Sequence, residues 1–564
     1  MSDDVKLPDT QAAVQLVGPG ELTLNRKKPV HAPTGRQILA KVQAVGLCFS
    51  DLKLLKQFSD HPRKGPVVEG IDPSVLESLP SYVPGEEPTV PGHEVAAEIV
   101  AVGEEVQHHQ VGETVMVQAD YRPLKTHGSN GAFGYNFEGG LQEYILTDER
   151  VVMDGDQRFL IPVDGEEKDQ SASAVALVEP WACVENSYVT LERRRLKPDG
   201  KLLIVVEPGR KVDGIDDAFD EDGRPAHVTM MCGDDEQVQA VRDLGFEVAL
   251  SGGAQDLPDE HFDDIVYFGT SKEGIDSLND KLAAGGIFNI VLGGCEIGQP
   301  ISVGVGRVHY GGTRWIGTTS TSAAVAYRNI PETGEIRPGD RVMVIGAGGP
   351  MGQMHTIRDI CCGMKNVSVV ATDFDSERLE ALKKKAAPFA RQTGVPLELV
   401  NPENTEIDGD FTYFALMAPI GELVSQSIAD ADDDALINIF AGIPAPTRHD
   451  LDMDAYIAKR CFMFGTSGSR ITDMKIVLTK VLSKQLDTNC SVDAICGMAG
   501  AEAGIVAVEN RRIAGKIIVY PQLKETGLIP LAELEDHYET VAAKLGEGGL
   551  WTARAEKELL KVGK

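Results

Sequence analysis

The segment from Arg341 to Asp373 constrains the fold of this chain more than any other. It begins with an apolar run, Val342–Ile345, that is typical of a buried parallel strand, and continues in a glycine-rich turn, Gly346-Ala-Gly-Gly-Pro-Met-Gly352. A segment that can be helical follows, and a second apolar run, Val367–Ala371, leads to the acid. Strand, glycine turn, helix, strand and closing acid make up a dinucleotide-binding βαβ unit.

The turn and the acid predict which residues hold the cofactor. Glycines let the backbone approach a pyrophosphate, and the helix N-terminus offers that anion free N–H groups. Asp373 lies about 20 residues past the turn, where a carboxylate can bind the adenosine ribose and repel the 2′-phosphate of NADP, so NAD is expected. The turn departs from G-x-G-x-x-G, because its last glycine is residue 352. The alternative is a tight strand-to-helix turn that binds nothing. The predicted cofactor-binding residues are Gly346, Gly348, Gly349, Pro350, Met351, Gly352 and Asp373.

Composition excludes several classes of protein. The 564 residues suffice for two to four domains, and 42% apolar with 25% charged residues is ordinary for a globular protein. We find no apolar run of about 18 residues and no signal-peptide pattern at the start, so no membrane partner is expected. Nine cysteines without a CxxC pair fit a reducing cytoplasm. A net charge of −32 argues against a nucleic-acid partner.

The pattern changes along the chain and then repeats. Residues 12 to about 185 alternate short apolar runs with glycine turns, which is typical of a mostly β domain, whereas residues from about 196 follow an α/β pattern. Four segments of that α/β part recur after about 140 to 150 residues, so we infer two tandem doubly wound domains. The matching pairs are Leu196–Val206 and Ile336–Ile345, Asp264–Phe268 and Asp410–Phe414, Ile287–Val291 and Leu436–Phe440, and Gly317–Ser322 and Gly465–Ser469.

The first copy lacks the nucleotide chemistry of the second. It carries Glu207-Pro208-Gly209-Arg210 in place of the glycine turn and Cys232 or Gly233 in place of the closing acid. A glutamate would repel a pyrophosphate, and a proline removes an N–H donor. We expect this copy to be structural or an interface; the alternative is that it binds another ligand.

Three short segments carry zinc-ligand types. They contain Cys48, His93 and Glu179, and a catalytic zinc site uses three protein ligands and leaves one position open. Ser50 could then pass on a proton, and Asp51 could orient a ligand histidine. Taken singly, the cysteine could be a buried apolar residue, the histidine a turn residue and the glutamate a surface acid.

Together with their surroundings, these segments resemble the zinc-dependent alcohol and polyol dehydrogenases of the medium-chain dehydrogenase/reductase superfamily. The similar motifs span most of the chain outside the first α/β copy, residues 56–87 and the C-terminal tail. They are Gly46–Asp51 and Gly92–Glu94 for the first two ligands, Glu98–Gly103, the strand motif Gly139–Tyr144, the glutamate-proline segment Ala176–Pro180, and the closing helix and strand in Ala501–Tyr520.

The resemblance implies roles for these residues. Cys48, His93 and Glu179 would bind zinc, Glu94 would be an alternate or water-bridged ligand, and Ser50 would be the proton relay. The zinc would lie in the cleft between a GroES-like catalytic domain and the second Rossmann domain, with hydride transferred to C4 of the nicotinamide. Because the family's four closely spaced cysteines are absent, one catalytic zinc and no structural zinc are expected. Lys53 stands where many members carry a relay histidine.

The resemblance also implies the substrate class. The glutamate-type ligand set is typical of polyol and sugar dehydrogenases, and the run Gly349–His355 is similar to that of sorbose-1-phosphate reductase-like members. An NAD-linked oxidoreductase acting on a secondary alcohol or ketone of a polyol, sugar or sugar phosphate is therefore predicted, and a homo-oligomer is expected. The alternatives are a non-catalytic or regulatory nucleotide-binding protein and a zinc-free quinone or enone reductase of the same superfamily.

The predicted fold class is thus α/β, with four segments. Residues 1–189 form a GroES-like, mostly β catalytic domain, 190–328 a degenerate Rossmann-like domain and 329–482 the NAD-binding Rossmann domain. Residues 483–564 return to the catalytic domain and end in a helical tail. A single helix is expected to place Leu531, Leu534, Tyr538, Val541 and Leu545 on one face.

Overall fold

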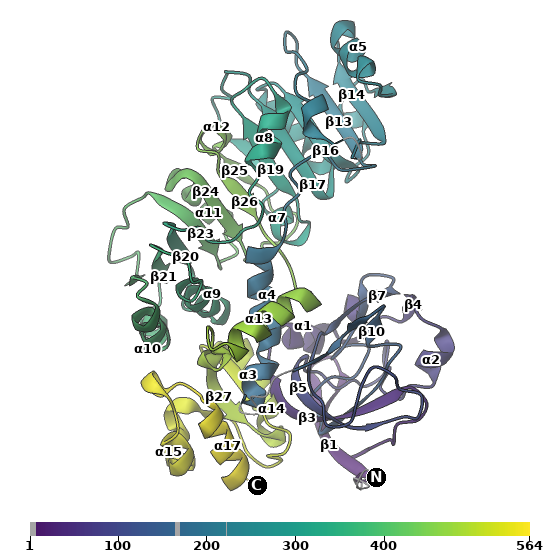
Figure 1. Ribbon diagram of the computed structural model, residues 1–564, viewed down its shortest axis with the longest axis vertical. Coiled ribbons are helices and arrows are strands. Elements are labelled where there is room, and N and C mark those ends of the chain that lie inside the picture. The colour runs from purple at the N-terminus through teal and green to yellow at the C-terminus, as the bar shows by residue number, and fades with distance from the viewer. Residues whose placement is uncertain (1–6, 164–169, 221–222, 564) are drawn as a thin grey trace. The chain divides into compact units, whose positions relative to one another are not determined.

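The chain divides into two compact units. The computed structural model describes residues 7–163, 170–220 and 223–563. Unit 1 comprises residues 1–185 and 469–564, and unit 2 comprises residues 186–468. In unit 1, strands from both ends of the chain, purple and yellow in Figure 1, belong to one sheet. Helix α4 (Val178–Val189) runs from the first unit into the second.

The large sheet of unit 1 is organised around strand β3 (Gln37–Gly46). This strand is buried along most of its length and pairs with β5, β9 and β28. The strand order is β12-β6-β5-β3-β28-β27-β29, with β9 beside β3. The other strands are β5 (Glu94–Val102), β6 (Thr114–Val117), β9 (Tyr144–Asp148), β12 (Leu160–Pro162), β27 (Val492–Cys496), β28 (Lys516–Val519) and β29 (Ile529–Pro530).

Smaller sheets and short helices surround this sheet. The three small sheets are β1 (Thr10–Gly18) with β2 (Glu21–Pro29), β10 (Met153–Asp154) with β11 (Gln157–Arg158), and β4 (Val67–Glu69) with β7 (Asp120–Thr126) and β8 (Asn130–Ala132). The helices are α1 (Phe49–Gln57), α2 (Pro73–Glu77), α3 (Ala172–Ala176), α13 (Ile471–Leu482), α14 (Ala501–Glu509), α15 (Leu534–His537), α16 (Glu539–Ala542) and α17 (Ala553–Val562).

The prediction of a single C-terminal helix, made from the apolar pattern, is wrong. The backbone of Tyr538 leaves the helical region (φ −144°, ψ 74°), so the segment forms the two short helices α15 and α16. A longer helix, α17, follows them. Thr552 caps its start, because the threonine side chain accepts a hydrogen bond from Ala555 N. The apolar spacing alone did not reveal this break.

Unit 2 contains two six-stranded parallel sheets with the same strand order. The orders are β15-β14-β13-β16-β17-β19 and β22-β21-β20-β23-β24-β26, the 3-2-1-4-5-6 arrangement of doubly wound folds. The first sheet consists of β13 (Lys201–Val206), β14 (His227–Cys232), β15 (Val248–Leu250), β16 (Phe262–Phe268), β17 (Leu282–Val291) and β19 (Arg314–Thr318). The second consists of β20 (Arg341–Ile345), β21 (Ser368–Thr372), β22 (Leu397–Val400), β23 (Phe411–Leu416), β24 (Ala431–Ile439) and β26 (Phe462–Phe464).

Helices follow most of these strands, and their ends obey local rules. For example, the Asp375 side chain caps the start of α10, and Gly394 ends the same helix in the left-handed conformation (φ 75°). The helices of the first sheet are α5 (Asp235–Asp243), α6 (Lys272–Leu278), α7 (Gly306–Tyr310) and α8 (Ala323–Asn329). Those of the second are α9 (Pro350–Ile360), α10 (Ser376–Thr393), α11 (Gly421–Ala429) and α12 (Met453–Ala458).

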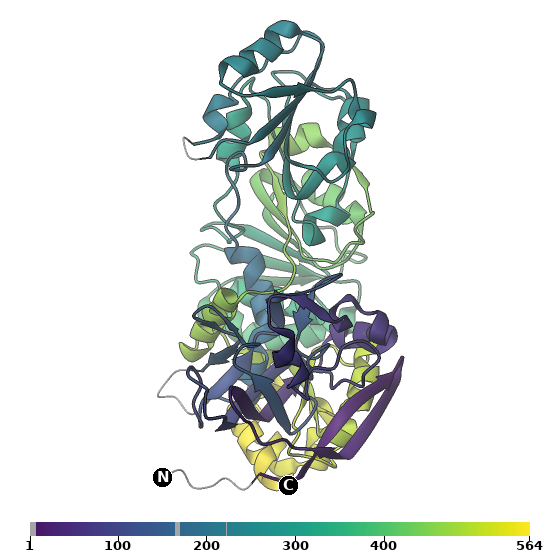
Figure 2. The same cartoon turned by 90° about the vertical axis from the view of Figure 1, so that its right-hand side faces the viewer.

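The two sheets of unit 2 share one core. A single cluster of buried apolar side chains includes residues of both sheets, among them Phe288 and Trp315 from the first and Ile437 and Met463 from the second. A separate antiparallel pair, β18 (Ile301–Val303) and β25 (His449–Leu451), also connects them. The two sheets, teal and green in Figures 1 and 2, therefore form one packed body.

Within the described ranges, no helix is both long and apolar enough to span a bilayer.

Residues 56–87, which lie outside the motifs of the resemblance, contain a buried lysine. Lys64 is fully buried, and its Nζ donates to the carbonyl oxygens of Val83 and Glu87. Burial lowers the pKa of this ammonium to about 8. The lysine thus holds the segment together from inside.

Lys64→Met should therefore destabilise the protein. The variant keeps the apolar stem but leaves two carbonyl groups without their donor, which costs about 1–3 kcal/mol. Chemical denaturation followed by circular dichroism measures the change. Lys56→Met is the control, because Lys56 is exposed and pairs with Glu509 at the surface, where an ion pair contributes less than about 1 kcal/mol. Equal effects of the two substitutions would contradict the structural role of Lys64.

Candidate active site

The turn between β3 and α1 positions the first candidate ligand. Cys48 is the N-cap residue of α1, and its backbone N donates to Asp51 Oδ2 at 2.9 Å. The same carboxylate, through Oδ1, lies 3.2 Å from His93 Nδ1. One aspartate therefore fixes both the helix start and the histidine ring, as carboxylates commonly do for metal-binding histidines.

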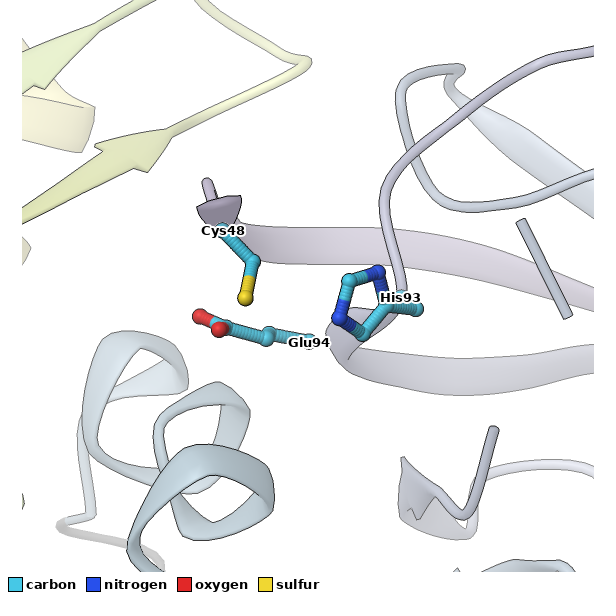
Figure 3. A group of neighbouring side chains, drawn as sticks. All are labelled: Cys48, His93 and Glu94. Atoms are coloured by element: carbon cyan, nitrogen blue, oxygen red, sulfur yellow. The ribbon is translucent and has the colours of Figure 1, made fainter. Parts of the chain in front are cut away.

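Three candidate ligands converge at this point. One atom each of Cys48, His93 and Glu94 can be chosen so that all lie within 4.8 Å of one another (Figure 3). His93 is 6% exposed and Glu94 is fully buried. The Ser50 hydroxyl lies 3.1 Å from Cys48 Sγ and 3.2 Å from His93 Nε2, so the predicted relay residue touches two of the three groups.

A buried lysine from the C-terminal segment completes the cluster. Lys516, the first residue of β28, forms an ion pair with Glu94 Oε1 and donates to Leu47 O at 3.0 Å. The other carboxylate oxygen, Glu94 Oε2, is buried and has no hydrogen-bond partner among the described residues. No motif in the sequence marks Lys516, which lies 422 residues from its partner.

Burial and neighbouring charges shift the pKa values of the side chains in this cluster. Burial alone would raise the pKa of the Cys48 thiol, but Lys516 and His93 together lower it to about 6. Burial raises the pKa of Glu94 to about 8, although Lys516 opposes this rise. The thiol therefore ionises easily, whereas the carboxyl resists ionisation. A cation bound here would stabilise the ionised forms of both groups.

The residues present fit a divalent metal. Sulfur, imidazole nitrogen and carboxylate oxygen are the donors that zinc uses, and metal binding requires their deprotonated forms. The histidine offers Nε2, because Asp51 occupies its Nδ1. The unpartnered, buried Glu94 Oε2 supplies an oxygen at the same place.

Glu179 lies near the cluster but outside it. It belongs to the first turn of α4, and Cys183 Sγ is 4.0 Å from its Oε1. Burial raises the pKa of Glu179 to about 7, and the charges of His93 and Glu94 are close enough to act on it. The structure thus brings Cys48 and His93 together with Glu94 and places Glu179 at the periphery.

Aromatic and basic side chains flank the cluster. The Tyr135 ring lies 6.1 Å from that of His93 and 4.9 Å from that of His61. Arg63 lies over the same ring at 5.5 Å and pairs with Asp120 at 2.8 Å. Burial and the neighbouring Arg63 lower the pKa of His61 to about 4. No sequence motif predicted these neighbours, because loops from three parts of the chain bring them together.

In unit 2, the glycine-rich turn lies between β20 and α9. Gly346 has φ 84°, and Gly349 is the N-cap of a helix whose first residue is Pro350, with no side chain capping it. A Cβ on Gly352 would lie 2.6 Å from Ala347 Cα, so this glycine allows the helix to approach the strand. Gly352 has the packing role of the last glycine of the G-x-G-x-x-G motif, although it lies one residue later in the sequence.

The remaining predicted cofactor residues lie at the same turn. Asp373 follows β21 directly, and its Oδ2 accepts a hydrogen bond from Gly348 N at 2.9 Å. Met351, the second residue of α9, has a backbone N–H in the uncapped first turn. The predicted cofactor residues therefore lie together at the turn, the helix start and the strand end.

The corresponding turn of the first sheet is built differently. The Glu207 carboxylate, just past β13, accepts hydrogen bonds from Ser271 N at 2.6 Å and Thr270 N at 3.1 Å. It also accepts one from the Tyr267 hydroxyl. Where α9 follows β20, the described residues after β13 form only a short helical turn, 216–218, before β14. An internal carboxylate thus uses the N–H groups at this end of the sheet.

Comparison with known proteins finds a domain model and relatives that are similar to parts of this chain. Residues 34–157 match the alcohol dehydrogenase GroES-like domain. The D-altritol 5-dehydrogenase of Agrobacterium fabrum is 25% identical over 57% of this chain and 86% of its own length. The mannitol-1-phosphate 5-dehydrogenase of Aliivibrio fischeri is 23% identical over 57% of this chain and 77% of its own.

A solved structure shows the same fold. The 2R,3R-butanediol dehydrogenase of Bacillus subtilis superposes with a TM-score of 0.50 at 14% identity, covering 91% of this chain and all of the other. In its α/β fold, its GroES-like domain and these relatives, the chain is similar to the zinc-type medium-chain dehydrogenase/reductase superfamily.

Lys516→Met should destabilise the protein more than a surface substitution would. Removing one partner of a buried ion pair leaves Glu94 uncompensated and costs about 3–5 kcal/mol. Adding Glu94→Gln should restore part of this loss, because the remaining group is neutral. Denaturation of both single variants and the double variant measures the coupling. Lys524→Met, which removes the half-exposed lysine that pairs with Glu143, is the control and should change the unfolding free energy by less than about 1 kcal/mol.

Proposed function

We propose that this chain is a zinc-dependent dehydrogenase that transfers a hydride between NAD(H) and a secondary alcohol or ketone. The main support is the buried cluster of Cys48, His93 and Glu94, in which one carboxylate oxygen has no partner among the described residues. Bound zinc would act as a Lewis acid on the substrate oxygen and lower the pKa of its hydroxyl. The proposed ligands are Cys48, His93 and one or both of Glu94 and Glu179.

The surrounding side chains support distinct roles. Ser50, in contact with both Cys48 and His93, would accept the proton from the substrate hydroxyl. Asp51 holds the histidine through Nδ1, so that Nε2 is the ring nitrogen left for a metal, and Lys516 pairs with Glu94. The ligands are thus oriented before substrate arrives, which lowers the cost of reorganisation during the reaction.

The cofactor in this proposal is NAD, bound at the turn Gly346–Gly352. The uncapped start of α9 would receive the pyrophosphate, and the Asp373 carboxylate at the end of β21 would receive the ribose. That carboxylate carries a charge which disfavours the additional phosphate of NADP.

The proposed substrate is a small polyol, sugar or sugar phosphate. Support comes from the relatives, whose names specify D-altritol and mannitol-1-phosphate. Arg63 and His61 near the cluster add hydrogen-bond donors of the kind that hydroxyl-rich or anionic substrates need.

The same proposal covers the organisation of the chain. We regard residues 190–328 and 329–482 as duplicated Rossmann-like domains, supported by the identical strand order of the two sheets. Residues 1–189 and 483–564 would form the catalytic domain. Nine free cysteines favour a reducing cytoplasm, the charge of −32 disfavours nucleic acid, and a homo-oligomer is proposed from the family.

Metal analysis tests the proposal most directly. Plasma mass spectrometry of purified protein should find about one zinc per chain, because one tetrahedral site has protein ligands. Cys48→Ser should lose the metal and the formation of NADH with a polyol panel. Cys295→Ser, at an exposed cysteine, should keep both. Glu94→Gln and Glu179→Gln, compared in the same assay, would identify the carboxylate ligand. A folded wild type without zinc would refute the ligand assignment.

Cofactor preference tests the role of Asp373. Asp373→Asn retains an acceptor for Gly348 N but removes the charge that repels the 2′-phosphate. Binding of NADPH, measured by fluorescence titration, should tighten on the order of tenfold relative to NADH, the equivalent of ~1.4 kcal/mol. Glu380→Gln, on the exposed face of α10, is the control and should leave the ratio unchanged. An unchanged ratio in Asp373→Asn would contradict the role given to this residue.

A further inference from the structure

The second halves of the two sheets in unit 2 correspond element by element. Each later element ends 148 residues after its counterpart. The pairs are β17 (Leu282–Val291) and β24 (Ala431–Ile439), β18 (Ile301–Val303) and β25 (His449–Leu451), and α7 (Gly306–Tyr310) and α12 (Met453–Ala458). The edge strands β19 and β26 begin with the same offset, at Arg314 and Phe462.

The pairing of β18 with β25 is centred on equivalent residues. The strands are antiparallel, and Ser302 pairs with its own counterpart, Asp450. Ile301 pairs with Leu451 and Val303 with His449, so each pair mirrors the other. A pair of equivalent strands in this register has a two-fold axis through its central residues, which is the signature of an isologous contact.

Contacts farther from this axis are reciprocal as well. A Cβ on Gly317 would lie 2.5 Å from Ile457 Cδ1. A Cβ on Gly465, the counterpart of Gly317, would lie 3.0 Å from the Cα of His309, the counterpart of Ile457. Residue i thus touches residue j, and the equivalent of j touches the equivalent of i, as a two-fold contact requires.

The loops before β18 and β25 repeat the same exchange. Ile297 N and Gly298 N donate to the Asp454 carboxylate at the start of α12, at 2.9 and 2.7 Å. Gly306, the counterpart of Asp454, donates its N–H to Thr447 O at 3.1 Å. The loop of each sheet therefore binds the helix start of the other.

This contact combines buried apolar side chains with hydrogen bonds. The shared core cluster includes buried Trp315 on one edge strand and Met463, its counterpart, on the other. The Tyr456 hydroxyl joins the two strands, since it donates to Trp315 O at 2.8 Å and accepts from Met463 N at 2.9 Å. An apolar, hydrogen-bonded contact of this kind is typical of permanent interfaces.

In the described residues of the first sheet, the turn after β13 differs from the glycine-rich turn of the second sheet. Its turn holds the Glu207 carboxylate on the N–H groups of Thr270 and Ser271. A negative charge already occupies the donors there, so a phosphate would be repelled. Among the features of this sheet, those at the contact match the second sheet most closely.

We propose that residues 190–328 act as a built-in partner subunit for the dinucleotide-binding sheet. The first sheet covers the edge strand β26 through a two-fold contact of the kind that two identical subunits make, so that one chain contains both halves of the interface. The inference extends the duplication proposed above and makes no use of the metal or of hydride transfer.

Two consequences follow for the assembly of the protein. An open edge strand is a template for pairing with other chains, and this contact covers β19 and β26 together. A second copy of the chain cannot dock at either edge while the contact is intact. Any homo-oligomer must therefore use another surface.

Disulfide trapping across the two-fold axis tests this proposal. Ser302→Cys with Asp450→Cys places two thiols on directly paired antiparallel positions, where Cα atoms lie about 4.5–5.5 Å apart, within the range of a disulfide. After mild oxidation of the full-length protein, peptide mass spectrometry should find the 302–450 bridge, and non-reducing electrophoresis should show a single-chain mass. Ser302→Cys with Glu380→Cys, which places the second thiol on α10, is the control and should give no bridge.

Other outcomes would overturn the proposal. A 302–450 bridge between two chains would mean that a second copy supplies the partner sheet, and a folded double variant without the bridge would mean that the contact is absent. Hydrogen exchange on the wild type gives the same decision if the variant does not fold. Amides of β18 and β25 should be protected equally at high and low protein concentration, whereas loss of protection on dilution would refute a contact within one chain. None of these readouts depends on activity, so they stand apart from the test of the dehydrogenase.

Discussion

The buried ion pair between Glu94 and Lys516 is the constraint on which unit 1 depends. Glu94 begins β5, Lys516 begins β28, and both strands pair with β3 at its Gly46 end. Two full charges are removed from water here, a cost that is offset only when geometry and further hydrogen bonds are good. The pair therefore needs both chain ends in register, and the correct register brings the cysteine, histidine and carboxylate together.

The same pair sets the chemistry of the cluster. Lys516 favours the thiolate of Cys48 and pairs with only one oxygen of Glu94, so the second oxygen remains available to a cation. A neutral residue in place of the lysine would remove the charge that lowers the pKa of the Cys48 thiol, and a metal needs its ligands deprotonated. Structural stability and readiness to bind metal thus arise from one interaction.

The sequence was most informative where the chemistry is local. The glycine turn, the closing acid and the apolar strands of unit 2 could be recognised because strand, turn and helix follow within about 30 residues. Cys48, Ser50 and Asp51 lie on one helical turn, so their proximity was also predictable. Lys516 was not, because only the folded sheet places it beside Glu94. The break at Tyr538 was missed for a related reason, since apolar spacing reports which face is buried and not where the backbone turns.

The repeat illustrates the same limit at a larger scale. Matching segments indicate that two parts of a chain share a fold, but they carry no information on how the parts pack. The packing follows from the pairing of Ser302 with Asp450 and from the reciprocal contacts of Gly317 and Gly465, which a register of one residue more or less would abolish. The first sheet lacks the glycine turn of the second and still makes this contact, because turn and edge strand lie at different places on the sheet. The contact between the two sheets therefore does not require a glycine turn in both of them.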